Sequence, residues 1–109
     1  MVEGLWIVQF HGPQGNGGGV VVLVNDRVLG GDSGFSYSGT YELKGDTFKA
    51  KVSVKNFDSA TPSVLGIPGN FDLLIEAKLQ GNTINGTAAL ASAPDSKMVV
   101  RLKKDTDLK

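Results

Sequence analysis

The fold is decided by the stretch Gly30-Gly31-Asp32-Ser33-Gly34-Phe35-Ser36-Tyr37-Ser38-Gly39-Thr40-Tyr41-Glu42-Leu43. It begins as a glycine-rich corner and continues as a strand in which large apolar residues alternate with small or polar ones. Successive side chains of a strand point to opposite faces, so this alternation predicts one buried face and one solvated face. Gly39 falls on the buried face between two tyrosines, and a glycine there indicates a bend or bulge that lets a sheet curl.

The rest of the chain divides into short segments of the same kind, separated by turn-forming residues. We predict further strands at Gly4–His11, Gly19–Val24, Arg27–Leu29, Thr47–Lys55, Asn70–Gln80, Thr83–Ala91 and Lys97–Lys103. Consecutive strands are joined by turn signals at Asn25-Asp26, Gly45-Asp46, Gly81-Asn82 and Ala93–Ser96, which predicts an all-β antiparallel meander. Eight such strands close naturally into an up-and-down barrel, and a two-sheet sandwich is the alternative.

Three segments fall outside these strands. The glycines and the proline of Gly12–Gly19 predict a loop without regular structure. A short helical turn is predicted near residues 62–66, because Pro62 suits the first helical position and Gly66 can end the turn. The polar tail from Lys104 to Lys109 is expected to fray.

Length and composition predict a single barrel domain over residues 1–109. The chain is 40% hydrophobic, which is enough for one core, and it contains no cysteine for a disulfide or a thiolate metal site. Lysine plus arginine and aspartate plus glutamate each number 11, and this balance disfavours nucleic-acid binding, which needs cations to neutralise phosphates. No segment resembles a signal peptide or a membrane span, so we expect a cytoplasmic protein.

No arrangement of residues predicts catalysis, a metal site or a bound cofactor. His11 is the only histidine, and nothing in the sequence places it beside Asp32-Ser33, the nearest thing to a catalytic partner. One histidine with scattered carboxylates does not make a metal site. The outward lysines of one predicted strand, Lys49, Lys51 and Lys55, are interpreted as a solvated face, because no outward aromatic residues accompany them.

Two sets of apolar residues are candidate binding surfaces. Leu5 and Ile7 point outward from the first predicted strand, and they are a candidate dimer face because apolar side chains there need cover. Aromatic side chains point inward, and the barrel either fills with them or holds one small apolar ligand or lipid. The candidate lining residues are Trp6, Phe10, Phe35, Tyr37, Tyr41, Phe48 and Phe71.

The opening Gly4-Leu5-Trp6 resembles the Gly-x-Trp start of calycin barrels such as lipocalins, in which the tryptophan packs near a basic residue of the last strand; Arg101 is the candidate here. A longer resemblance covers almost the whole chain. The sequence is similar to the GrlR family, negative regulators of type III secretion genes in Gram-negative bacteria. The residues that carry this resemblance are Gly4 with the alternating strand after it, Gly30-Gly31-Asp32, Tyr37-Ser38-Gly39 and Pro62-Ser63-Val64-Leu65-Gly66-Ile67.

The GrlR resemblance implies a calycin-like barrel that forms a homodimer and acts without enzymatic activity, by contact with a transcriptional activator. It implies no DNA binding by the protein itself. The acidic recognition run of the best-known member corresponds to the turn that holds Glu42, Lys44 and Asp46, and these are candidate partner-contact residues although Lys44 interrupts the acidic run. Two functions therefore stay open at this point: a regulatory binding protein, and an intracellular carrier of a small apolar ligand.

Overall fold

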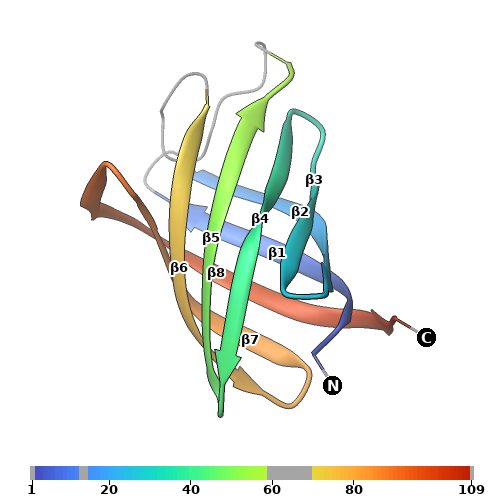
Figure 1. Ribbon diagram of the computed structural model, residues 1–109. Coiled ribbons are helices and arrows are strands. Elements are labelled where there is room, and N and C mark those ends of the chain that lie inside the picture. The colour runs from blue at the N-terminus through green and yellow to red at the C-terminus, as the bar shows by residue number, and fades with distance from the viewer. Residues whose placement is uncertain (1, 13–14, 59–69, 109) are drawn as a thin grey trace.

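A computed structural model describes residues 2–12, 15–58 and 70–108 of the chain. These residues form eight antiparallel strands that close into a barrel in chain order, with β4, β5 and β6 crossing in front of β1 and β8 in Figure 1. The strands are β1 (Gly4–Gly12), β2 (Gly15–Val24), β3 (Arg27–Gly31), β4 (Phe35–Lys44), β5 (Thr47–Asn56), β6 (Phe71–Gln80), β7 (Thr83–Leu90) and β8 (Ala93–Asp107). The up-and-down barrel is confirmed, and the sandwich is excluded because β1 pairs with β8. The helical turn predicted near residues 62–66 lies outside the described residues.

Tight turns set the order of the strands. Asn25 and Asp26 have φ angles of 49° and 63°, which identifies a type I′ turn, the form whose twist matches a two-residue hairpin. Gly45 and Gly81 also have positive φ and begin the predicted hairpin turns between β4 and β5 and between β6 and β7. The last hairpin differs from its prediction: the turn falls at Ala91-Ser92, and residues 94–96 are extra residues of β8 between two paired positions.

The alternation in the sequence translates directly into an apolar interior. Every strand contributes inward side chains to one continuous core, and the largest that are fully buried are Trp6, Phe48, Leu23, Ile84 and Val100. The predicted inward residues of β5 are all buried, while its lysines are exposed. Burying one aliphatic or aromatic side chain stabilises a fold by about 1.5–3 kcal/mol, so this core supplies most of the driving force.

Gly39 lies where β4 and β5 approach each other closely. A Cβ atom built on Gly39 would lie 1.9 Å from the carbonyl oxygen of Lys51 and 2.8 Å from Cα of Val52. The registers on both sides of β4 run through Gly39 without a shift, so it marks a close approach in a bent sheet and not a bulge. Gly86 has the same role between β6 and β7, where a Cβ would lie 2.1 Å from the carbonyl oxygen of Glu76.

Two segments expected to be irregular belong to strands. Gly15–Gly19, predicted as part of a loop, forms the first half of β2 and pairs with β1 residue by residue. Lys104 to Asp107, predicted to fray, continues β8 and pairs with Trp6, Leu5 and Gly4. In both segments the ladder to β1 supplies hydrogen bonds that outweigh the poor strand propensity of glycine or of a charged tail.

The end of β8 covers Trp6. The indole Nε1 donates to the carbonyl oxygen of Val2 at 2.8 Å, and Nζ of Lys104 lies 5.4 Å from the ring centroid, within range of a cation–π contact. The Lys104 side chain is only 9% exposed and forms an ion pair with Asp107 at 3.0 Å. Lys104 therefore takes the place suggested for Arg101, which is exposed, because inward side chains of β8 continue in steps of two from Leu102.

Asp32 organises the corner between β3 and β4. Its Oδ1 accepts hydrogen bonds from the backbone N–H groups of Gly34 and Phe35, both at 2.9 Å, and its Oδ2 accepts one from the hydroxyl of Tyr37. The N–H of Asp32 in turn donates to the carbonyl of Phe35 at 2.9 Å. Such local bonding by an aspartate stabilises a turn, and here it also satisfies the hydroxyl of a buried tyrosine.

The substitution Gly39→Ala tests the close approach between β4 and β5. The added methyl overlaps backbone atoms that cannot move aside as a side chain would, so we expect a loss of about 1–3 kcal/mol in the free energy of unfolding. Urea titration followed by Trp6 fluorescence measures this loss. Ser38→Ala is the control, because it changes the preceding residue without adding volume, and equal stabilities of the two variants would contradict the interpretation.

Candidate functional site

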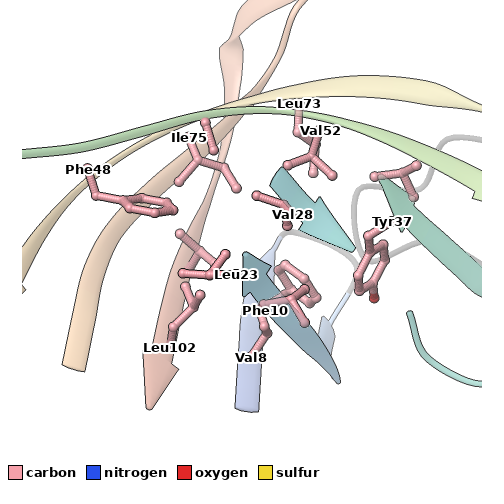
Figure 2. A pocket seen from close by; sticks show the side chains of 14 residues that line it. Val8, Phe10, Leu23, Val28, Tyr37, Phe48, Val52, Leu73, Ile75 and Leu102 are labelled. Atoms are coloured by element: carbon pink, nitrogen blue, oxygen red, sulfur yellow. The ribbon is translucent and has the colours of Figure 1, made fainter. Parts of the chain in front are cut away.

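A small void lies among the described core residues in the interior of the barrel. Its volume is about 40 Å³, and Figure 2 shows Phe48 and Tyr37 at opposite ends of its lining. Three of the predicted lining residues, Phe10, Tyr37 and Phe48, do line it, together with aliphatic residues such as Val28 and Leu73. Ligand pockets measure about 300–1,000 Å³, and a cavity of about 150 Å³ is already needed for benzene. The void is therefore much smaller than a lipid.

The other predicted lining residues pack against neighbouring rings. Tyr41 stacks on Phe48 with centroids 5.4 Å apart, and Phe35 lies 6.4 Å from Phe71 in a tilted arrangement. Trp6 is fully buried beneath Lys104, so it does not reach the void. Aromatic pairs at these spacings add favourable contacts beyond burial alone. The aromatic residues thus fill the barrel more than they line a pocket.

Both tyrosines of the chain are held in their neutral form. Burial raises the pKa of Tyr37, and its hydrogen bond to Asp32 and the charge of that carboxylate raise it further. Burial also raises the pKa of Tyr41, and the negative charges of Glu3 and Asp26 act in the same direction. A phenol that resists ionisation is a poor general base, so neither group is poised for proton transfer near neutral pH.

The candidate partner-contact turn carries mixed charge. Glu42 and Lys44 are exposed on β4, and the carboxylate of Asp46 forms an exposed ion pair with Nζ of Lys78 at 3.3 Å. Glu42 stands opposite Lys49 of β5, which stands opposite Glu76 of β6 on its other side. The predicted basic strand face is therefore flanked by carboxylates in this row, and neither an acidic nor a basic patch of one sign forms here.

His11 has a partner that was not predicted from the sequence. Its Nδ1 lies 2.8 Å from Oδ1 of Asn16 across the β1–β2 hairpin, and both side chains are exposed. Asp32, named above as a catalytic partner, uses both carboxylate oxygens within its own corner. Within the described part of the chain, no group of three or more histidine or carboxylate side chains could hold a metal ion. The same residues contain no helix long and apolar enough to cross a membrane.

Apolar side chains lie side by side on the outside of β1, β2 and β3. Leu5 pairs with Val22, which pairs with Leu29, and the next row holds Ile7 opposite Val20. Ile7, Val20 and Leu29 are 43%, 45% and 37% exposed, and the other two are partly exposed. We call these five residues the apolar outer face.

Leu5 and Ile7 were predicted to form part of such a surface, whereas Val20, Val22 and Leu29 were not. The run from Gly19 to Val24 is apolar at nearly every position, which is typical of a strand buried on both faces. In the structure only Val21 and Leu23 of that run are buried. The signal that could have identified Val20 and Val22 is that their run follows the first predicted strand and pairs with it. Their outward side chains therefore lie beside Leu5 and Ile7.

Polar side chains border the apolar outer face. Ile7 stands opposite Lys103 of β8, Leu5 opposite Thr106, and Leu29 opposite Ser38 of β4. An apolar centre with a polar rim is the usual composition of a protein–protein contact. Exposed apolar residues that form a continuous patch, unlike single ones, indicate an interaction surface.

No protein-family model matches the chain, and no curated protein matches it. Of what the GrlR resemblance implies, the structure shows the eight-stranded closed barrel.

The raised tyrosine pKa values predict a loss of stability in alkali. Above pH about 10 the unfolded chain releases its phenolic protons while the native protein retains them, so the unfolded state binds fewer protons and stability falls as pH rises. Each retained proton contributes a slope of about 1.4 kcal/mol per pH unit. Below pH about 10 this contribution is fully present.

Absorbance of tyrosinate in the native protein, combined with urea titrations across alkaline pH, measures the effect. In Tyr37→Phe the slope should fall to that of Tyr41 alone, since the chain has two tyrosines. Ionisation of both tyrosines near pH 10 in the native protein would contradict the prediction.

Proposed function

We propose that this protein is a non-enzymatic regulatory binding protein, a homodimer that acts by contact with a transcriptional regulator, as the GrlR resemblance implies. The observation that carries the proposal is the apolar outer face. Three of its five side chains are more than a third exposed on a regular and rigid sheet, where the exposure cannot be relieved by a local rearrangement. Covering them with another protein surface removes apolar area from water, which is favourable by roughly 25 cal/mol per Å².

The volume of the barrel interior supports a binding protein over a carrier. A carrier needs a cavity of the size of its cargo, and the void here is about 40 Å³. The aromatic residues that were candidates for a lining pack in pairs against each other, and Trp6 packs beneath Lys104. A fatty acid would have to displace several packed rings, which costs the contacts that stabilise the core.

The distribution of charge supports a protein partner over nucleic acid. Among the outward lysines of β5, Lys49 stands between Glu42 and Glu76, so a phosphate backbone would meet both signs of charge in this row. A partner protein can meet alternating charges with its own, which gives specificity more than affinity. The turn that holds Glu42, Lys44 and Asp46 is then a second candidate contact for the partner protein.

The substitution Val20→Lys tests the apolar outer face. We expect the wild-type protein to be a dimer at micromolar concentration and the variant to dissociate at least about tenfold more readily, because a charge replaces buried apolar area at the contact. Sedimentation equilibrium measures both constants. Val99→Lys is the matched control, because Val99 is 48% exposed on β8 outside this face. A wild-type monomer would contradict the proposed homodimer.

The regulatory role is tested with a transcriptional regulator encoded beside the gene. The two purified proteins should form a complex on gel filtration, and Val20→Lys or a charge reversal at Glu42 should weaken it by a measurable factor in calorimetry. Absence of a complex with such a regulator, under conditions where the barrel is folded, would overturn the proposed role.

A further inference from the structure

Among the residues that the structure describes, one edge of β2 has no paired strand over half of its length. β2 pairs with β1 from Gly15 to Leu23, but its pairing with β3 is restricted to Val20–Val24. The barrel is closed through the pairing of β2 with β3 at Val20–Val24, and Gly15–Gly19 has no strand paired to this edge in the described part of the chain; we call this stretch the open edge. Unpaired strand edges are templates for the addition of another strand.

The ladder determines which groups point to the open edge. The two-residue turn at Asn25-Asp26 makes Val24 and Arg27 a hydrogen-bonded pair, and such pairs alternate along antiparallel strands. By this alternation Gly15, Gly17 and Gly19 bond to β1, while Asn16 and Gly18 direct their N–H and C=O groups away from β1. Both residues are exposed, and among the described residues no backbone bond outside the ladders involves them.

The open edge lacks the usual protection against strand addition. Proteins protect edges with charged side chains, proline or a bulge. Gly15–Gly19 contains neither a charge nor a proline, and its register with β1 is continuous. The backbone there carries a single side chain, Asn16, so another strand can approach without a clash.

We propose that a second copy of this chain occupies the open edge, with two β2 strands pairing antiparallel about a two-fold axis at Gly17. In this register Asn16 lies opposite Gly18 of the second copy, and the reverse pair follows by symmetry. We call this contact between the two β2 strands the seam. Both residues of each pair point their backbone N–H and C=O groups across the seam, so two hydrogen-bonded pairs form. A register shifted by one residue would place Asn16 opposite a glycine whose groups are already bonded to β1.

The edge is continuous with the apolar outer face. Gly19 is followed directly by Val20, and Ile7 stands beside Val20 on β1. The seam therefore ends beside Val20, at the border of the apolar outer face, and the outer faces of the two copies lie on the same side of the joined sheet. This inference rests on the homodimer of the proposed function and specifies how its two copies meet.

The pair of variants Asn16→Pro and Asn16→Ala tests the seam. Both remove the side-chain bond to His11, but only proline removes the N–H that faces the edge, and neither removes a bond to β1. We expect Asn16→Pro to raise the dimer dissociation constant at least about tenfold over Asn16→Ala, because symmetry removes two hydrogen bonds at once. Sedimentation equilibrium measures the constants, and thermal unfolding verifies that the barrel is intact.

Hydrogen exchange of the wild-type protein gives a second, independent readout. The amides of Asn16 and Gly18 should exchange more slowly as protein concentration rises through the dissociation constant, whereas exchange of the amide of Lys97, a β8 residue outside the open edge, should not change. Equal dissociation constants for the two variants, or concentration-independent exchange at Asn16 and Gly18, would overturn the seam. If Val20→Lys still dissociates the dimer in that case, the proposed homodimer stands without the seam; a wild-type monomer overturns both.

Discussion

The pairing of β1 with β8 is the constraint on which the rest of the structure depends. It runs from Gly4 opposite Asp107 to His11 opposite Val99, and it joins the two ends of the chain side by side, as Figure 1 shows. Without it the sheet would have two long edges and Trp6 would lie open at one of them. Closure requires a curled sheet, and the close backbone approaches at Gly39, between β4 and β5, and at Gly86, between β6 and β7, allow that curl. The one-residue shift between Leu5 and Trp6 then brings Lys104 over the indole.

The alternation of apolar and polar residues along the sequence predicted the barrel well, because the strands have one face toward the core and one toward solvent. It was accurate for β5, where lysines and apolar residues alternate without exception in side-chain exposure. It was less accurate where partner strands, not local composition, decide the structure. Gly15–Gly19 has no strand propensity of its own and is held by β1, and Lys104 reads as a solvated tail until its aromatic contact is known. The turn at Ala91-Ser92 was misplaced because proline at position 94 is a stronger turn signal than the residues that form the turn.

The candidate site shows a similar division. The alternation of side chains along each strand predicted which aromatic residues point inward. It does not predict whether they fill the interior, because that depends on the summed volumes of side chains from all the strands. The apolar outer face was partly predicted from Leu5 and Ile7. Its remaining residues could not be assigned from one strand at a time, because a patch exists only when the register places Val20 and Val22 beside them and Leu29 in the next position.

The corner at Asp32 connects the barrel to both proposed surfaces. β3 ends at Gly31 because Asp32 bonds to the backbone of Gly34 and Phe35 and turns the chain into β4. A longer β3 would continue along β2 and pair with Gly15–Gly19, and the edge would be closed. A Cβ on Gly19 would lie 2.6 Å from the carbonyl of Gly31, so the corner fits tightly against β2 at the point where pairing stops. The corner whose Asp32 accepts a hydrogen bond from the buried Tyr37, and from which β4 starts, is therefore also the reason that β3 does not pair with the first half of β2.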